Sequence, residues 1–106
     1  MFPVETISVK MLDYYVGRHD CLILDLRREE AFRKGHVKGA RNIPYEEIEE
    51  GNISLKEDKD KVLVLYCERG GASLKAARIL AAQGWKTRSV IGGFAAYRGR
   101  NLVISG

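Results

Sequence analysis

Runs of apolar residues alternate along the chain with segments in which apolar and polar positions follow a helical period. Residues Val62–Tyr66 form a continuous apolar run, preceded by charge and followed by glycine, and they predict a buried strand. From Leu74 the period changes, and one helical face collects the apolar residues Leu74, Ala77, Leu80 and Ala81. Gly84 is placed to end this predicted helix. A buried strand, a glycine-bearing loop and a helix are therefore expected to follow one another directly.

The rest of the chain shows the same alternation between short apolar runs and amphipathic or charged segments. Strands are predicted at residues 21–24, 41–43, 86–91 and 102–104, the last as an edge strand. Helices are predicted at residues 9–16 with Ser8 as the cap, 27–34, 45–50 and 94–97. Turns are predicted at residues 35–40, and a polar loop anchored by Ile53 and Leu55 at residues 51–61.

Alternating strands and helices predict the α/β class, with a mainly parallel central sheet and helices on both faces. The 106 residues fit one domain, 1–106, and an apolar content of 45% can build one core. In such sheets ligands bind beyond the carboxyl ends of the strands. Cys67 follows one strand, and Asp25 and Arg27 end another, so these side chains are expected at the same edge.

Cys67 is the residue to which this arrangement assigns chemistry. The loop that carries the chain from it into the helix consists of Glu68, Arg69, Gly70, Gly71, Ala72 and Ser73. Such a loop can turn several backbone N–H groups inward, and the helix N-terminus adds partial positive charge. Both features favour a thiolate over a thiol, so Cys67 is predicted to be a nucleophile in an anion-binding cradle. The alternative is a buried, inert cysteine followed by an ordinary strand-to-helix turn.

Cys21 begins its predicted strand, whereas Cys67 follows the end of another. If the two strands are parallel, the two cysteines are separated by roughly 13–17 Å, at about 3.3 Å per residue. A disulfide requires Cα atoms within about 7 Å. We therefore predict no Cys21–Cys67 bond and interpret Cys21 as a small core residue.

The charge and composition of the chain indicate which classes of binding partner to expect. The 18 basic and 14 acidic residues give a net charge of +4, which indicates attraction of small anions or an acidic partner, or simply a solvated surface. No basic run interleaves with aromatic residues as in single-strand binders, so no nucleic-acid role is expected. No stretch approaches the ~20 apolar residues that cross a membrane, and residues 1–5 do not resemble a signal peptide. A cytoplasmic, reducing compartment is the resulting expectation.

Four segments, in the right order, resemble the single-domain rhodanese family over about residues 6 to 104. Leu24-Asp25-Leu26-Arg27 resembles the family's strand-end Asp-x-Arg. The stretch from Gly35 to Pro44 is similar to its Gly-His-Ile-x-Gly-Ala-x-Asn-Ile-Pro. Val64-Leu65-Tyr66-Cys67 with the glycine-bearing loop resembles its active-site segment, and the stretch from Gly92 to Tyr97 resembles its Gly-Gly-x-x-x-Trp.

The resemblance implies a three-layer rhodanese-like fold and sulfur transfer. Cys67 would attack the outer sulfur of thiosulfate, or of a related small anionic donor, and become a persulfide. Cyanide or a thiol, including a thiol on a protein, would then take the sulfur. The N–H groups of residues 68–73 would hold the anionic persulfide. No metal and no organic cofactor is required, because sulfur itself is the covalent intermediate.

One position departs from the family pattern. Many family loops carry an arginine five residues after the cysteine, where this chain has Ala72, and Arg69 stands closer to Cys67 instead. Arg69 then supplies charge from another direction, or the donor is not thiosulfate. The departure also leaves open a non-catalytic interaction or regulatory module that retains the fold. Phosphatase or arsenate-reductase chemistry is disfavoured, because those loops are one residue longer and carry an arginine at the position of Ser73.

Five further side chains have expected positions. Asp25 is expected to bond to backbone near the loop or to Arg27. Arg27 is expected to line the mouth of the site or to form a structural ion pair. Glu68 is expected to face solvent. His36 is interpreted as a packed, hydrogen-bonded turn residue rather than a proton shuttle, and Trp85 as packed against the sheet.

Overall fold

A five-stranded parallel sheet is the centre of the protein, which a computed structural model describes at residues 4–51, 55 and 59–104. Across the sheet the strands follow the order β1-β6-β5-β2-β4. These strands are β1 (Val4–Ser8), β2 (Cys21–Asp25), β4 (Arg41–Asn42), β5 (Val62–Tyr66) and β6 (Lys86–Ile91). Every neighbouring pair is parallel, so all carboxyl ends lie along one edge.

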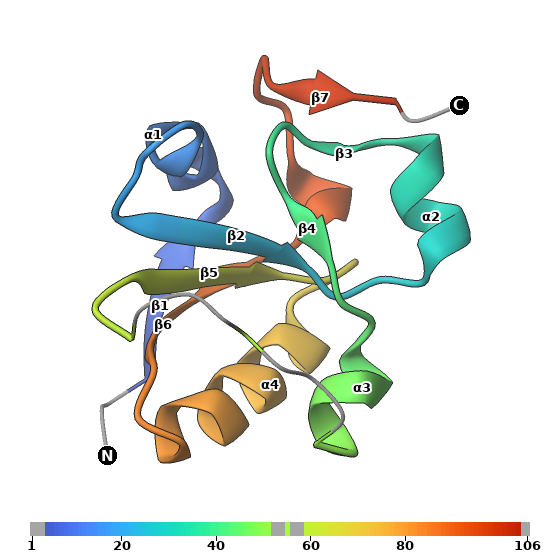
Figure 1. Cartoon of the computed structure of the whole chain (residues 1–106). Coiled ribbons are helices and arrows are strands. Elements are labelled where there is room, and N and C mark those ends of the chain that lie inside the picture. The colour runs from blue at the N-terminus through green and yellow to red at the C-terminus, as the bar shows by residue number, and fades with distance from the viewer. Residues whose placement is uncertain (1–3, 52–54, 56–58, 105–106) are drawn as a thin grey trace.

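Helices cover both faces of this sheet (Figure 1). On one face lie α3 (Tyr45–Glu49) and α4 (Gly71–Ala82). On the other lie η1 (Val9–Met11), α1 (Leu12–Tyr15) and η2 (Phe94–Ala96), and α2 (Glu29–Lys34) lies beyond the carboxyl end of β2. The predicted α/β architecture, with a mainly parallel sheet between two helical layers, is confirmed.

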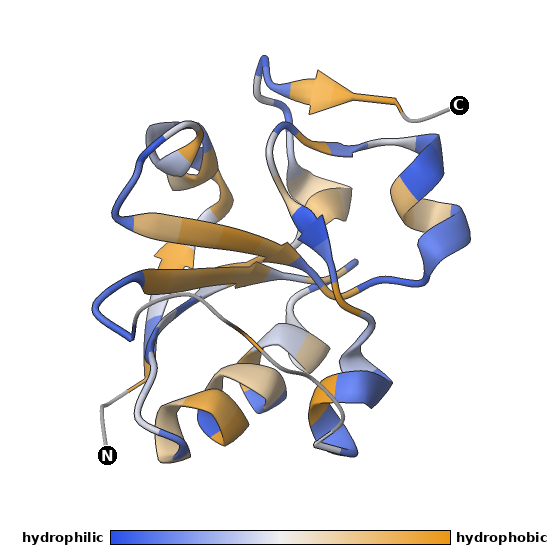
Figure 2. Ribbon diagram, viewed as in Figure 1, coloured by the Kyte–Doolittle hydropathy of each residue, from blue (hydrophilic) through white to orange (hydrophobic). Residues whose placement is uncertain are grey.

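Successive side chains of β5 point to opposite faces, and both faces are buried. Leu63 and Leu65 belong to the cluster that packs under α3 and α4, together with Leu80 and Trp85. Val64 and Tyr66 belong to the cluster on the other face, which includes Leu12 of α1 and Tyr97. Figure 2 shows that β2 and β5 are hydrophobic along most of their length. Burial on both faces is the reason that β5 reads as a continuous apolar run.

The first element differs from the prediction. Residues Val4–Ser8 form β1, which pairs with β6, whereas no strand was predicted there. Ser8 precedes η1 in an extended conformation, but its side chain makes no capping hydrogen bond. Most side chains of β1 are exposed or half-buried, so its sequence carries little apolar signal. The strand forms because β6 offers it a hydrogen-bonding edge, which is a tertiary condition.

A second, two-stranded sheet was also not predicted. His36–Val37 (β3) pairs antiparallel with Leu102–Val103 (β7), so the expected turns contain a strand, and the expected edge strand joins it rather than the central sheet. Two predicted helices begin elsewhere: α2 starts at Glu29 rather than Arg27, and α4 at Gly71 rather than Leu74. In the polar loop, Leu55 packs against the core as expected, and Ile53 lies outside the described residues.

The two cysteines lie at opposite ends of neighbouring strands, as predicted. Cys21 is opposite Val62 at the start of β5, whereas Cys67 follows the end of that strand, and both thiols are free. The Cys21 thiol donates a hydrogen bond to the carbonyl of Tyr15 at 3.2 Å. Burial raises the pKa of this thiol. The interpretation of Cys21 as a core residue is therefore confirmed.

Candidate active site

Cys67 directly follows β5, and a sharp turn brings the chain from it into α4. The turn is made at Gly70, whose φ of 106° lies in the left-handed region that side chains disfavour. Because the turn is so tight, Gly71, Ala72 and Ser73 already belong to the first turn of the helix. The segment that was predicted as a loop is thus half loop and half helix.

Backbone N–H groups converge on the Cys67 sulfur. The N–H of Gly70 donates to Sγ at 3.0 Å, and the N–H of Ser73 donates at 3.4 Å. The carbonyl oxygens of Cys67 and Glu68 point the other way and accept hydrogen bonds from Phe94 N (2.8 Å) and Ala95 N (3.0 Å). The predicted cradle of inward N–H groups therefore exists, and the start of η2 fixes its orientation.

Gly93 permits this contact between η2 and the cradle. A methyl group added at Gly93 would lie 2.5 Å from the carbonyl oxygens of Cys67 and of Glu68. Its φ of 62° is also in the left-handed region. Gly93 is therefore needed for the close approach of two backbones, a role that sequence reasoning did not assign to it.

Two buried hydroxyl groups support the cradle from beneath. The Ser73 hydroxyl bonds to the carbonyl of Gly70 at 3.0 Å and to the hydroxyl of Ser89 on β6 at 2.9 Å. Both serines are almost fully buried. These bonds tie the helix start, the turn and a neighbouring strand together. Ser73 was predicted as a loop residue, whereas nothing in the sequence around Ser89 marked it.

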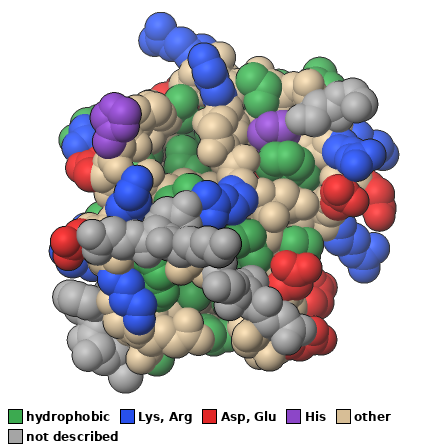
Figure 3. All heavy atoms as spheres, in the orientation of Figure 1, with side chains coloured by type: hydrophobic (Ala, Val, Ile, Leu, Met, Phe, Trp, Pro, Cys, Tyr) green, Lys and Arg blue, Asp and Glu red, His purple; other side chains and the backbone are tan. Residues whose placement is uncertain are grey.

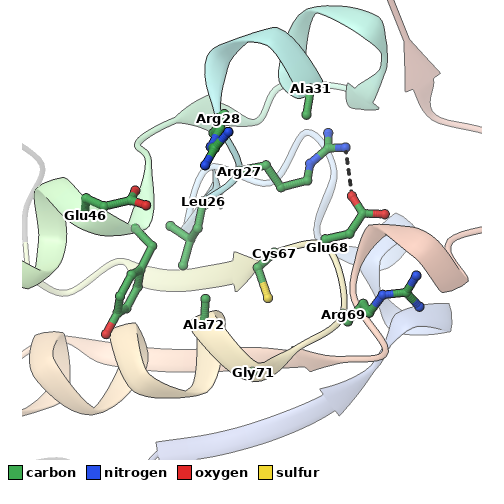
Figure 4. A pocket seen from close by; sticks show the side chains of 11 residues that line it. Leu26, Arg27, Arg28, Ala31, Glu46, Cys67, Glu68, Arg69, Gly71 and Ala72 are labelled. Carbon is green, nitrogen blue, oxygen red and sulfur yellow. Dashed lines mark hydrogen bonds and ion pairs between the residues drawn. The ribbon is translucent and has the colours of Figure 1, made fainter.

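Cys67 is largely buried. Only 6% of the residue is accessible to solvent, and it packs within the cluster of α3 and α4. It nevertheless lines a groove of about 510 Å³ at the carboxyl edge of the sheet (Figure 4). The groove is also lined by Leu26, Arg27, Arg28, Ala31, Tyr45, Glu46, Glu68, Arg69, Gly71 and Ala72. The sulfur is therefore reached through this groove.

A buried ion pair forms beside the groove. The Nη2 atom of Arg27 lies 2.8 Å from Oδ2 of Asp25, and Nη2 also donates to the carbonyl of Gly35 at 2.6 Å. Burial opposes the charge of Arg27, but the hydrogen bonds and charge of Asp25 hold the pKa of Arg27 above its ordinary value. Asp25 also accepts hydrogen bonds from the backbone N–H of Arg27 at 2.9 Å and from its Nε at 3.1 Å. Both expected roles of Arg27, pairing with Asp25 and lining the site, are found together.

Glu68 and Arg69 lie at the mouth of the groove and point to different sides. Oε1 of Glu68 is 3.5 Å from Nη1 of Arg27, although about half of the Glu68 side chain is exposed to solvent. The side chain therefore faces solvent, as expected, and also reaches across to Arg27. The guanidinium of Arg69 extends away from the Cys67 sulfur (Figure 4). Ala72 lines the groove close to Cys67, so no loop side chain brings a cation to the sulfur.

Of the two remaining sequence interpretations, that of Trp85 is confirmed, whereas His36 is packed and hydrogen-bonded as expected but lies in strand β3 rather than in a turn. His36 is buried, stacks on Phe32 with ring centroids 3.7 Å apart, and has Nδ1 at 2.8 Å from the Phe32 carbonyl. Trp85 is buried in the cluster under α4. Neither residue lines the groove.

Sequence reasoning missed one whole wall of the groove. Leu26, Ala31 and Tyr45 come from three different segments, and nothing in their local sequence marks them as site residues. Two backbone bonds build this wall, because Leu26 N donates to the Tyr66 carbonyl at 2.9 Å and Tyr45 N to the Leu26 carbonyl at 3.0 Å. The only available signal was that Leu26 and Tyr45 closely follow strand ends.

Across residues 4–51, 55 and 59–104, no three His, Cys, Asp or Glu side chains gather as a metal-binding group. In the same parts of the chain, no helix has the length and apolar character needed to cross a membrane.

Comparison with known proteins found similar sequences and a similar fold. The model of the rhodanese-like domain matches residues 8–100. Thiosulfate sulfurtransferase GlpE of Coxiella burnetii is 32% identical over 84 residues, which cover 78% of this chain and 77% of that protein. The GlpE of Shewanella oneidensis is 32% identical over 102 residues, covering 95% and 99%. The crystal structure of a rhodanese-like domain protein from Staphylococcus aureus superposes with a TM-score of 0.79 at 25% identity, covering 96% of this chain and 99% of that one.

Proposed function

This chain belongs to the rhodanese-like family, and from that membership and the geometry around Cys67 we propose that it is a sulfurtransferase that works through a Cys67 persulfide. The observation that carries the proposal is the pair of N–H groups, from Gly70 and Ser73, directed at the Cys67 sulfur. Relatives named thiosulfate sulfurtransferase support the reaction class.

In the first step the Cys67 thiolate attacks the outer sulfur of a sulfane donor. With thiosulfate, a bond forms between Sγ and the outer sulfur, and the bond between the two sulfur atoms of the donor breaks. Sulfite leaves with that electron pair. The product is a persulfide anion on Cys67, and the cradle supplies hydrogen bonds to its negative charge without reorganising.

In the second step an acceptor nucleophile attacks the terminal sulfur of the persulfide. Cyanide leaves as thiocyanate and regenerates the Cys67 thiolate, and a small thiol or a protein thiol leaves as its own persulfide. Every step moves one sulfur atom and one electron pair, so the reaction needs no external oxidant or reductant. The chain's own groups suffice to bind, orient and stabilise the anion.

The experiment is a comparison of the wild type with Cys67→Ser. Mass spectrometry of the intact wild-type protein after thiosulfate treatment is expected to show the mass of one added sulfur atom, which cyanide then removes. Cys67→Ser should show no adduct and no thiocyanate production, with unfolding free energy within about 1 kcal/mol of the wild type. The change should be small because the serine hydroxyl can accept hydrogen bonds from the same Gly70 and Ser73 N–H groups.

Cys21→Ser is the matched control, because Cys21 lies at the opposite end of the sheet and does not line the groove. This variant should keep both the adduct and the turnover. A folded wild type that takes up no sulfur from any sulfane donor would contradict the proposal. That outcome would favour the alternative of a non-catalytic interaction module.

A further inference from the structure

The groove beside Cys67 has a balanced charge rather than a cationic one. Three arginines border it together with two carboxylates, and a third carboxylate, Asp25, is buried beside it in an ion pair with Arg27. The charged residues concerned are Arg27, Arg28, Arg69, Asp25, Glu46 and Glu68. A donor that carries two negative charges therefore gains no net side-chain attraction here, and its charge is met only by the backbone N–H groups.

The positions of the arginines strengthen this conclusion. Arg27 is occupied by Asp25, by the Gly35 carbonyl and by Glu68, and its guanidinium lies 4.0 Å from the ring centroid of Phe94. Arg69 extends away from the sulfur, as Figure 4 shows. Arg28 remains exposed at the rim. Acidic side chains gather over α3, as Figure 3 shows, and one of them, Glu46, lines the groove. The groove therefore binds a doubly charged donor weakly, whereas a singly charged donor can be bound.

The shape and lining of the groove indicate an organic ligand. A volume of about 510 Å³ lies within the ~300–1,000 Å³ that pockets for organic molecules occupy. Its inner wall consists of apolar or aromatic side chains, Leu26, Ala31, Tyr45 and Ala72. An inorganic oxyanion would leave that wall in contact with water, whereas an apolar group attached to the sulfane sulfur would cover it.

We propose that the donor is a singly charged organic sulfane compound, whose apolar body lies against Leu26, Tyr45 and Ala72, and that Glu68 disfavours doubly charged donors such as thiosulfate. This inference rests on the proposed sulfur transfer and assigns its substrate class. An organic persulfide fits the description. The Cys67 thiolate would take its outer sulfur, the sulfur–sulfur bond of the donor would break, and the organic thiolate would leave with the electron pair.

Three probes isolate the two features of the donor. Thiosulfate carries two charges and no apolar group, methanethiosulfonate carries one charge and a methyl group, and benzenethiosulfonate carries one charge and a ring. All three transfer the same outer sulfur to Cys67, and the two thiosulfonates share the same kind of leaving group, a sulfinate. The readout is kcat/KM for thiocyanate production, with the Cys67 persulfide checked by mass spectrometry.

The apolar wall is tested by the ratio of kcat/KM for benzenethiosulfonate to that for methanethiosulfonate. The wild type should prefer the ring by about tenfold, because the ring covers apolar wall that the methyl group leaves exposed. Tyr45→Ala should bring this ratio close to one, whereas Tyr14→Ala, at an exposed tyrosine away from the groove, should leave it unchanged. Both kcat/KM values are measured on the same protein sample. Partial unfolding of a variant lowers both values by the same factor and leaves their ratio unchanged.

The charge is tested with Glu68→Gln, and Glu47→Gln on α3 is the control because its carboxylate does not line the groove. Glu68→Gln should raise kcat/KM for thiosulfate about threefold to tenfold. The electrostatic energy scales with the charge of the donor, so the gain for either thiosulfonate should be about the square root of that factor. Glu47→Gln should change neither value appreciably.

The outcomes separate this inference from the proposed function. Equal use of the two thiosulfonates by the wild type, or an equal effect of Glu68→Gln on all donors, would overturn the assigned substrate class while sulfur transfer stands. A wild type that prefers thiosulfate to benzenethiosulfonate would do the same. A protein that forms no Cys67 persulfide with any of the three donors would overturn both.

Discussion

The cradle around Cys67 depends on a residue that lies outside it. Gly93 allows η2 to approach the carbonyl groups of Cys67 and Glu68, which accept hydrogen bonds from Phe94 N and Ala95 N and so fix the backbone from which the turn to Gly70 starts. At the scale of single residues, the geometry of the site therefore requires a glycine at position 93 as well as the thiol of Cys67.

Gly93→Ala should damage both stability and activity. The left-handed φ costs roughly 1–2 kcal/mol for a residue with a Cβ, and the clash with two carbonyl oxygens adds roughly 1–3 kcal/mol. Urea unfolding and the rate of sulfur transfer measure the two effects. Gly17→Ala is the control, because Gly17 has a similar φ of 80° and nothing within 4 Å of an added methyl group. Equal losses in the two variants would show that the close approach at Gly93 carries no energetic weight.

At the scale of elements, one carboxylate joins the first helix to the end of the chain. Asp13 of α1 accepts hydrogen bonds from the Tyr97 hydroxyl, from Asn101 Nδ2 at 2.9 Å and from Arg100 N at 3.3 Å. The bond from Tyr97 is the main reason that the pKa of Asp13 is lowered, and burial opposes it. Burial and the bond to Asp13 raise the pKa of Tyr97 to about 12. These hydrogen bonds hold residues 97–101, which follow η2, against helix α1 near the N-terminus.

Asp13→Asn should destabilise the protein at neutral pH, and the difference from the wild type should depend on pH. A carboxylate whose pKa is lowered on folding contributes stability above its unfolded pKa of about 3.9. That contribution is lost as the pH falls through the lower pKa of the folded state. Urea unfolding of both proteins at pH 7 and at successively lower pH is the measurement. A difference that stays constant below pH ~4 would contradict the assignment, and Glu47→Gln on the exposed face of α3 serves as the reference.

At the scale of the whole molecule, the sheet is buried on both faces by helices of very different length. The four-residue α1 places Leu12 in one cluster, and the twelve-residue α4 places Leu80 in the other. Both leucines are 0% exposed. Each face of the sheet therefore has its own cluster of buried residues, although one helix is short.

Leu12→Ala and Leu80→Ala should each lower the free energy of unfolding by about 2–5 kcal/mol, because each leaves a cavity in a packed cluster. Leu102→Ala, at a side chain that is 53% exposed, should change it by less than about 1 kcal/mol. Chemical denaturation followed by circular dichroism measures all three variants. A near-neutral Leu12→Ala would mean that the α1 face of the sheet is not a true second core.

The elements that the sequence predicts well are those whose residues are buried by strong local patterns. The runs that form β2, β5 and β6 are apolar or bounded by clear turn residues, and α4 carries an apolar stripe. Val4–Ser8 and His36–Val37 have no such pattern, because each forms a strand only when a distant partner, β6 or β7, supplies hydrogen bonds. A single-sequence pattern contains no information about that partner.

The sequence by itself determined that Cys67 follows a buried strand and precedes a helix, because hydrophobic period and glycine positions are local properties of the chain. It also predicted that Cys21 and Cys67 lie too far apart to bond if their strands are parallel, and the structure supplies that parallel pairing. Only the tertiary structure decided the charge and lining of the groove. The contacts of Arg27 with Glu68, of Leu26 with Tyr45 and of Gly93 with Cys67 join residues far apart in the chain, and their geometry depends on how the layers pack.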